Sequence, residues 1–320
     1  MSGPAIAIAG LRKSYGGRAA VDGLDLTVER GAITAVLGPN GAGKTTTLEI
    51  CAGLRTADAG SVQVLGLDPR RDRAALMPRL GVMLQAGGIY SGAKPVEMLR
   101  HVAALHANPL DPEELVELLG LDGARRTTYR RMSGGEKQLL ALGLALVGRP
   151  ELAFLDEPTA GLDPHARRRT WDLISGLRDV GVTVVLTTHL MDEAESLADH
   201  VHIVDKGRLI VSGTPDELTR AGNALTFSAP PGLPVSTLTG ALPEGTEASE
   251  PTPGHYLVSG PMDPTTLAAV TSWCADLGVM PDGLSVERRS LEDVFLELTG
   301  RKLTNWGLSA PGPAQTGSGT

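Results

Sequence analysis

The chain has 320 residues, a formal net charge of −8 at pH 7 and only 3% aromatic residues. Its length exceeds that of an average single domain, so we expect one large domain and a smaller one. An acidic chain with few aromatic rings offers neither a basic surface for phosphates nor platforms for stacked bases, which argues against nucleic acid as a partner.

The cysteines and apolar runs limit the compartment. Cys51 and Cys274 are far apart and lack the spacing of a disulfide or a metal site, which is typical of a reducing compartment. Residues 1–10 lack the basic and apolar segments of a signal peptide. The longest apolar run, 139–147, is far shorter than the roughly 20 residues of a membrane-spanning helix. We therefore expect a chain that is soluble by itself, with no span of its own.

Strands are predicted over 5–9, 24–28 and 33–37, from alternating or continuous apolar residues. Tyr15 lies in a polar segment, 12–17, between the first two strands. It could be an ordinary surface tyrosine, or its ring could stack on a purine base. The residues alone leave both interpretations open.

A glycine-rich loop leaves the third strand and opens a helix at Lys44. Its backbone can curl so that successive N–H groups point inward, while the helix N-terminus adds partial positive charge, which predicts a phosphate cradle. In such a loop the lysine reaches the β- and γ-phosphates and the following threonine ligates Mg²⁺. The alternative is an ordinary turn rich in glycine. The residues of this cradle are Gly38, Pro39, Asn40, Gly41, Ala42, Gly43, Lys44, Thr45 and Thr46.

A helical region is predicted next, at about 90–150. Two helical patterns follow one another over 95–119, and Asp111 caps the second, with Glu114 in position to complete a capping box. Just before this region, a short apolar strand over 81–85 ends in the amide of Gln85. That amide alone indicates little.

The segment Ser133, Gly134, Gly135 and Glu136 has two interpretations. It can be a capping box, with Ser133 bonded to the N–H of Glu136 and an apolar helix behind it. Glycine in a helix is less favourable than alanine by about 1 kcal/mol, so a pair in the first turn also indicates that a ligand approaches the backbone there. An anion is the obvious candidate.

Two adjacent carboxylates, Asp156 and Glu157, end the continuous apolar run 152–155, which is typical of a strand buried in a parallel sheet. One carboxylate can hold Mg²⁺ through its water shell, while the other orients an attacking water or accepts its proton. The alternative is a solvated acidic turn.

Further polar residues stand at the ends of predicted elements. Asp163 is a good N-cap for a helix over 164–178, and capping alone could explain it. A β-branched strand over 182–188 delivers His189 to its carboxyl end, where ligands of open α/β sheets bind. His189 could therefore contact a phosphate. No other histidine has the partners of a metal site, so we expect no metal beyond nucleotide-bound Mg²⁺.

The C-terminal part begins after a hairpin over 201–212 and a capped helix over 214–221. Residues 229–254 are rich in Pro, Gly, Ser and Thr, which predicts loops and short strands rather than a helix. A strand, a helix, a strand and a capped helix are expected between 255 and 299. We predict a small α+β domain over 222–300 and a disordered tail over 301–320.

Taken in order, the cradle, Gln85, the segment 133–136, the run 152–157, the segment 161–163 and His189 resemble the ATP-binding cassette (ABC) ATPases. The resemblance covers about residues 5–221. It implies an α/β fold with a phosphate-loop ATPase core, made of a mixed sheet with flanking helices, and a helical subdomain. The signature departs from the common pattern at Met132, Glu136 and Leu139, which we expect to tune activity.

The resemblance implies ATP and Mg²⁺ as cofactors and gives roles to matching residues. Tyr15 would stack on adenine, and Thr45 and Asp156 would belong to the metal site. Gln85 would sense Mg²⁺ and couple to a partner. Glu157 would be the catalytic base.

The resemblance also implies a homodimer. His189 would be the switch residue at the γ-phosphate, and Asp163 would lie in a loop that communicates between the subunits. The segment 133–136 would cap the nucleotide bound to the opposite chain, so that two chains enclose two ATP molecules.

The stretch 291–301 looks like the ending of the ABC-2-type exporter ATPases, notably the daunorubicin-resistance group. This implies export of a drug, antibiotic or lipid through a separate membrane permease, with the chain cytoplasmic and peripheral on the inner face of a bacterial cell membrane. A soluble ATPase acting on ribosomes or DNA is the alternative, but such proteins usually carry two cassettes or a coiled coil. A non-catalytic regulator is a third, and Glu157 and His189 argue against it.

Overall fold

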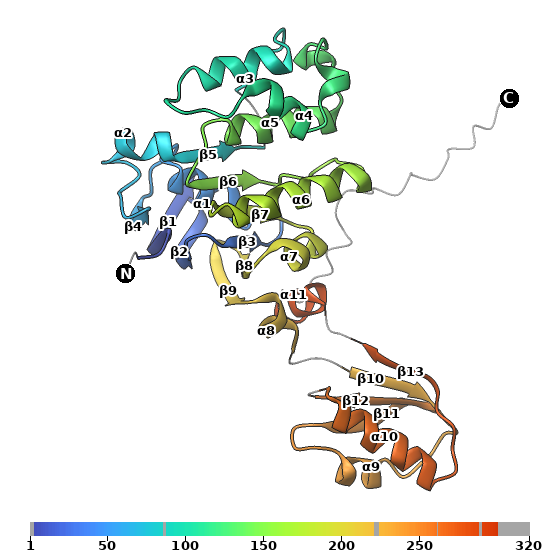
Figure 1. The fold of residues 1–320 in the computed structure, drawn as a ribbon. Helices are drawn as coiled ribbons and strands as arrows, with labels where there is room; N and C mark the ends of the chain where they lie inside the picture. Colours follow the sequence, from blue (N-terminus) through green and yellow to red (C-terminus); the bar gives the residue numbers. More distant parts are fainter. Residues whose placement is uncertain (1–2, 86–87, 221–223, 261, 288–289, 300–320) are drawn as a thin grey trace, which may run out of the picture.

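The computed structural model describes residues 3–85, 88–220, 224–260, 262–287 and 290–299 (Figure 1). The tail expected over 301–320 and the expected domain boundary at 221/222 lie outside these residues. The described chain contains three sheets, two in the first part and one near the C-terminus.

A six-stranded sheet forms the centre of the first part, and alternate residues of β3 enter two different apolar clusters, one on each face. Burial on both faces is what a parallel sheet between two layers requires, and it explains the continuous apolar runs. Five strands are parallel, and the last pairs antiparallel with its neighbour. In sheet order these are β5 (Leu80–Met83), β6 (Leu152–Asp156), β7 (Thr183–Thr188), β3 (Ile33–Leu37), β8 (His200–Asp205) and β9 (Arg208–Gly213).

A three-stranded antiparallel sheet, β2-β1-β4, contributes to one of these clusters. Its strands are β1 (Ile6–Tyr15), β2 (Arg18–Val28) and β4 (Ala59–Val64). The first strand is longer than predicted, so Tyr15 ends a strand instead of lying in a polar loop. It pairs with Arg18 across Gly16 and Gly17, which both have positive φ. A Gly-Gly pair is suited to such a tight hairpin, and this signal was available in the sequence.

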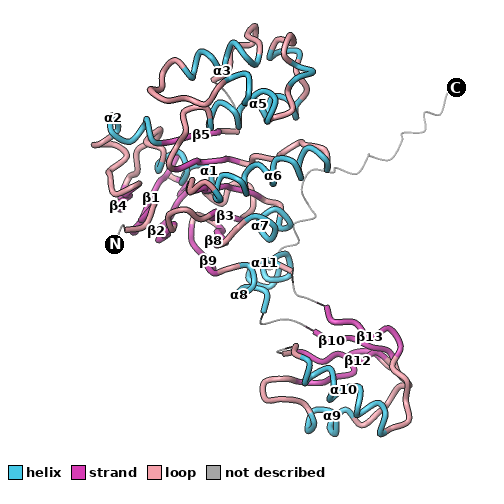
Figure 2. The backbone as a smooth tube through the Cα atoms, in the orientation of Figure 1, coloured by secondary structure: helices cyan, strands magenta, loops and turns pink. Residues whose placement is uncertain are grey.

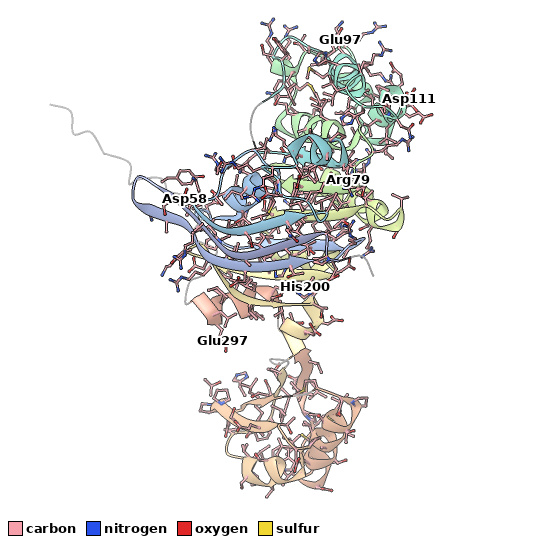
Figure 3. All side chains as sticks on the ribbon, turned by 90° about the vertical axis from the view of Figure 1, so that its left-hand side faces the viewer. Asp58, Arg79, Glu97, Asp111, His200 and Glu297 are labelled. Carbon is pink, nitrogen blue, oxygen red and sulfur yellow. The ribbon has the colours of Figure 1, made fainter. Side chains whose placement is uncertain are left out.

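Three helices form the expected helical region and pack on one another: α3 (Pro95–Ala103), α4 (Pro112–Leu118) and α5 (Gly134–Leu146). The Asp111 carboxylate accepts bonds from the N–H groups of Glu113 and Glu114, which confirms Asp111 as the cap. The bond from Glu114 back to the backbone of Asp111, which would complete the expected capping box, is not among the described hydrogen bonds. Figure 3 shows Asp111 and Glu97 in this region. The remaining helices of the first part are α1 (Lys44–Cys51), α2 (Arg73–Leu76), α6 (Pro164–Asp179), α7 (Met191–Leu197) and α8 (Pro215–Arg220).

A four-stranded antiparallel sheet, β11-β12-β10-β13, forms the C-terminal unit together with two helices (Figure 2). These elements are β10 (Ala224–Ser228), α9 (Val235–Ala241), β11 (Glu247–Thr252), β12 (His255–Ser259), α10 (Pro264–Asp276) and β13 (Asp282–Glu287). The expectation of no helix over 229–254 was wrong, because α9 lies there. Leu238 anchors it by complete burial in the core of this unit.

The last helix, α11 (Leu291–Thr299), was predicted to belong to the C-terminal domain, but its apolar residues pack elsewhere. Leu291, Val294 and Phe295 are buried in the core of the first part, and the helix contacts α7 and α8 (Figure 1). The N–H of Leu291 donates to the carboxylate of Glu195 on α7 at 2.5 Å. The C-terminal unit is thus an insertion between two helices, α8 and α11, that both pack with the first part.

Candidate active site

The glycine-rich loop joins β3 to α1 as predicted, and its lysine bonds back across it. The Lys44 ammonium donates to the carbonyls of Gly38 at 2.7 Å and Pro39 at 3.2 Å. Desolvation lowers the pKa of Lys44, while the charges of Glu157 and Asp156 oppose that shift. A cation held between a carbonyl-lined loop and two acids is placed where polyphosphate oxygens would be recognised.

Two glycines of the loop are required by sterics. A Cβ on Gly38 would collide with the carbonyl oxygen of Val204 in β8, and one on Gly43 would collide with that of Ala20 in β2. Gly43 also has a φ of +99°, which side chains other than glycine rarely adopt. The loop therefore passes so close to β2 and β8 that no side chain fits at these two positions.

Asp156, at the carboxyl end of β6, gathers two hydroxyl groups. The Thr45 hydroxyl lies 2.9 and 3.2 Å from its two carboxylate oxygens, and the Thr187 hydroxyl of β7 donates to the same carboxylate. Asp156 is completely buried. A carboxylate and a threonine hydroxyl side by side make a hard oxygen donor set, the kind that Mg²⁺ prefers.

Glu157 is held from both sides. Its Oε2 accepts from the Gln85 amide at 3.2 Å, and its Oε1 lies 3.2 Å from Nδ1 of His189. The hydrogen bond with His189 is the main cause of a lowered pKa for Glu157, which burial opposes and Lys44 assists. The carboxylate is therefore ionised at neutral pH and can accept a proton or a hydrogen bond. Glu157 also has a φ of +50°, a strained conformation for this residue.

A cavity of about 330 Å³ lies beside these groups, lined by Lys44, Gln85 and Glu157 among others but not by Asp156 or His189. Tyr15 is partly exposed at the cavity, with the Lys13 ammonium 5.5 Å and the Arg55 guanidinium 5.3 Å from its ring centre. Both cations lie within the distance at which a ring face attracts a positive charge, so they hold the Tyr15 ring at the cavity. The lining residues are Tyr15, Ala20, Asn40, Gly41, Gly43, Lys44, Thr45, Thr46, Gln85 and Glu157.

The segment 133–136 does not line this cavity. Ser133 and Glu136 form a reciprocal capping box at the start of α5, at 2.7 and 3.2 Å, so the structural interpretation of the segment is confirmed. The glycine pair is not explained by the cap. A Cβ on Gly134 would meet nothing within 4 Å, whereas one on Gly135 would lie 3.2 Å from Leu162. Gly134 is therefore not imposed by packing within the chain.

Asp163 also serves as a cap. Its carboxylate accepts from the N–H groups of His165 and Ala166 at 2.9 Å, and these bonds hold its pKa below the usual range. It starts α6, as predicted, and does not line the cavity.

Comparison with known proteins identifies the family of the chain. The family model described as "ABC transporter" matches residues 21–160. A daunorubicin resistance ATP-binding protein of Streptomyces coeruleorubidus is 37% identical over 94% of this chain and 97% of that protein. The chain belongs to the ATP-binding cassette family. It is an ATPase that binds ATP, and its fold is the phosphate-loop ATPase fold expected from the sequence.

Other relatives and solved structures agree with this assignment. A Nod factor export ATP-binding protein of Ralstonia nicotianae is 37% identical over 94% of this chain and 96% of its own length. The ATP-binding subunit of an ABC transporter superposes with a TM-score of 0.61 over 67% of this chain and 92% of that one, at 25% identity. A cassette solved as a dimer with ADP and phosphate has a TM-score of 0.61 over 65% of this chain and 98% of its own, and at 19% identity it shows the fold alone.

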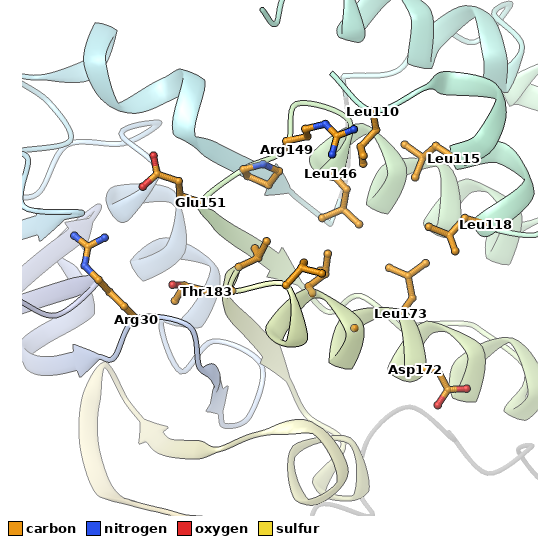
Figure 4. A pocket seen from close by; sticks show the side chains of 16 residues that line it. Arg30, Leu110, Leu115, Leu118, Leu146, Arg149, Glu151, Asp172, Leu173 and Thr183 are labelled. Atoms are coloured by element: carbon orange, nitrogen blue, oxygen red, sulfur yellow. The ribbon is translucent and has the colours of Figure 1, made fainter. Parts of the chain in front are cut away.

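A larger cavity, of about 740 Å³, lies elsewhere in the cassette (Figure 4). Its lining includes six leucines, among them Leu115, Leu146 and Leu173. Glu151, which also lines it, immediately precedes the strand that ends at Asp156. This cavity contains none of the phosphate-loop residues, so size does not identify the nucleotide site here. No helix of the described residues is long and apolar enough to cross a bilayer.

Sequence reasoning missed two residues that shape the site. The Gln138 amide donates to the backbone carbonyl of Glu157 at 2.6 Å, and the N–H of Glu157 bonds to the carbonyl and the hydroxyl of Thr187, both at 3.1 Å. Gln138 is the fifth residue of the α5 helix, one turn behind the glycines. Thr187 was detectable as a polar residue two positions before His189, near the end of an apolar strand.

Proposed function

We propose that this cassette powers an exporter: two copies close around two ATP molecules and drive a separate ABC-2-type membrane permease. The observation that carries the proposal is the position of Glu157, fixed between Gln85 and His189 at the mouth of the phosphate loop. That arrangement suits hydrolysis coupled to a partner. The Glu157 carboxylate is bonded both to His189, which we expect to contact the γ-phosphate, and to Gln85, which precedes the helical region in the chain.

Each site residue has a proposed role in hydrolysis. The loop N–H groups and Lys44 bind the phosphates, and Tyr15 stacks on the adenine. Glu157 orients a water in line with the γ-phosphate and accepts its proton. His189 contacts the γ-phosphate, and because it is bonded to Glu157 the carboxylate is correctly aimed only when the phosphate is in place.

Mg²⁺ fits the oxygens of Thr45 and Asp156, with Gln85 near by. Those two oxygens already lie within hydrogen-bond distance of each other, a spacing that two ligands of one cation can share. When bound, the ion would neutralise charge on the phosphates. Thr187 would keep the Asp156 carboxylate oriented towards it.

A homodimer is proposed because one chain supplies only part of the nucleotide's surroundings. The signature segment, 133–136, is outside the cavity and presents Gly134 with free space where a side chain would be. An opposing chain could offer its α5 N-terminus to the γ-phosphate there. Asp163, at the start of α6, is then in a position to communicate between the chains.

The exporter class rests on the relatives, which are named for daunorubicin resistance and Nod factor export. We propose that the cargo is a drug, antibiotic or lipid selected by the permease. The chain would then act on the cytoplasmic side, peripheral to the inner face of a bacterial cell membrane, and would not bind nucleic acid.

The dimer is tested by mixing two inactive chains, Lys44→Ala and Ser133→Arg. A heterodimer would contain one intact site, formed by the loop of one chain and the signature of the other, so random mixing should restore up to about a quarter of wild-type hydrolysis. Sites built within one chain would give no recovery. The control for an added arginine is Ser196→Arg, at an exposed position of α7, which should hydrolyse ATP by itself. It takes the place of Ser133→Arg in a second mixture with Lys44→Ala.

The exporter assignment is tested separately by affinity purification of the full chain from detergent-solubilised membranes of its own cell. A hydrophobic multi-helix protein should copurify in an ATP-dependent manner. Recovery only with ribosomes or DNA would contradict the assignment and favour the alternative class.

A further inference from the structure

Glu193, in the first turn of α7, is a buried acid that the roles above do not use. Its residue surface is only 1% exposed, although acids in a first helical turn normally face solvent. Burial raises the pKa of its carboxyl group, and three hydrogen bonds oppose that rise. A buried carboxyl group is costly unless its partners need it.

Three donors from three different segments meet at this carboxyl group. Its Oε1 accepts from the hydroxyl of Thr159 at 2.7 Å and from the indole N–H of Trp171 at 3.1 Å. The Thr188 side chain bonds to it as well. Thr188 in turn accepts from the N–H of Leu190 at 2.9 Å, which fixes the backbone on both sides of His189.

The three segments are those that carry the proposed chemistry. Thr159 is two residues after Glu157, and the N–H of Ala160 bonds back to the carbonyl of Glu157 at 3.1 Å. Thr188 immediately precedes His189. Trp171 belongs to α6, the helix that Asp163 caps. Glu193 is therefore the point at which the loop after β6, the end of β7 and α6 are joined.

We propose that Glu193 is a positioning residue that holds Glu157 and His189 at the spacing hydrolysis requires. The inference rests on the proposed roles of those two residues. An apolar side chain of similar size would fill the volume but leave the donors of the buried Thr159 and Thr188 and of the half-buried Trp171 without this acceptor. The loop after β6 and the end of β7 would then lose their common anchor. The loss should fall on the chemical step, because Glu193 is outside the cavity that holds the nucleotide.

The experiment measures kcat and KM for ATP hydrolysis, together with the affinity for trinitrophenyl-ATP, in purified full-length variants. We expect Glu193→Leu to lower kcat about tenfold and Thr159→Val about three- to fivefold, with KM and nucleotide affinity within about twofold of wild type. Glu193→Gln keeps an acceptor oxygen and should restore most of the activity. Trp171→Phe removes one donor and should resemble Thr159→Val.

The matched control is Thr170→Val. Thr170 is also a buried threonine and precedes Trp171 in α6, but the bond that the described residues show for its hydroxyl goes to the carbonyl of Ala166 in its own helix, at 2.9 Å. It should lose the same hydroxyl with kcat unchanged. A kcat loss equal to that of Thr159→Val would overturn the inference, and so would wild-type kcat in Glu193→Leu or a change confined to KM. Thr159→Val and Trp171→Phe carry the test if Glu193→Leu does not fold.

A Glu157→Gln variant separates this inference from the proposed function. If Glu157→Gln is inactive while the Glu193, Thr159 and Trp171 variants hydrolyse ATP normally, only the positioning role fails. If Glu157→Gln itself hydrolyses ATP normally, the proposed site fails and the inference fails with it.

Discussion

The nucleotide cleft and the C-terminal sheet bury different kinds of side chain. Around the cleft, Lys44, Asp156, Glu157 and Glu193 are all nearly or completely buried. The charges of Asp156 and Glu157 act on Lys44, whereas Glu193 is held by neutral hydrogen-bond donors. The C-terminal unit is built instead on aromatic packing, with the Phe227 and Tyr256 rings stacked at 5.1 Å and Trp273 edge-on to both. Burying a charged group lowers the stability of the fold. A concentration of such groups in one region therefore indicates a functional site.

The largest effect expected on the cleft comes from Glu157→Gln. The amide cannot accept a proton, so hydrolysis should fall about 10³-fold, close to 4 kcal/mol of activation free energy, while ATP still binds. Phosphate release under saturating ATP measures it. Glu151→Gln is the control, because Glu151 immediately precedes the opposite end of β6 and is paired with Arg79 at 2.7 Å. Near-normal hydrolysis in Glu157→Gln would contradict the role of Glu157 as the catalytic base.

The next largest effect concerns α11, the helix that follows the C-terminal sheet and packs on the first part. Phe295→Ala should lower the free energy of unfolding of the first part by about 3 to 4 kcal/mol, because its ring is buried in that core although it follows the C-terminal sheet in sequence. Hydrogen exchange of α7 and α8 amides locates the loss. Leu298→Ala, on the exposed side of the same helix, should change little. Faster exchange in the C-terminal strands alone would place α11 with the sheet after all.

The sequence predicts the cleft well where a motif must satisfy several physical demands at once. The cradle needs glycines, a lysine and a helix start in fixed order, and Asp156 and Glu157 follow a strand too apolar to be anything but central. Glu193 escapes such reasoning, because an acid in a first helical turn already has an ordinary explanation. Only the fold shows that Thr159, Trp171 and Thr188 converge on it.

The C-terminal part shows the opposite limitation. Helix α9 follows a proline-rich stretch and contains valine, threonine and glycine, which are poor helix formers, so local propensity argues against it. Packing decides the outcome, through Leu238 and the bond from Trp273 to Thr237. The amphipathic pattern of α11 predicts a helix correctly, but no local pattern names the surface on which it packs.

The stability of the first part should depend on pH through a buried histidine, His202. Burial lowers the pKa of His202 to about 4, so this histidine is neutral in the folded first part and donates from Nε2 to the carbonyl of Thr27. In the unfolded chain, His202 binds a proton near pH 6.5. The free energy of unfolding of the first part should therefore decrease by about 3 kcal/mol as the pH falls from 6.5 towards 4.

The measurement is the free energy of unfolding of the first part between pH 7 and pH 4, in wild type and His202→Gln. The variant should lack this part of the decline. His200→Gln is the matched control, because His200 is on the same strand and only partly buried, bonded to Ser212 at 2.8 Å. Equal slopes in wild type and His202→Gln would contradict the assignment.

The smallest effect belongs to the C-terminal sheet and tests its independence from the chemistry. Trp273→Phe keeps an aromatic ring in the cluster but removes the indole N–H that donates to the Thr237 hydroxyl at 2.8 Å. The unit should lose about 1 kcal/mol of unfolding free energy, the usual net value of one such bond. Hydrolysis by the cleft should not change, since the described contacts of Trp273 lie within this unit. A lower kcat without loss of folded protein would instead mean that the aromatic core is coupled to the cleft, most directly through α11, whose N-terminus bonds to Glu195 two residues after Glu193.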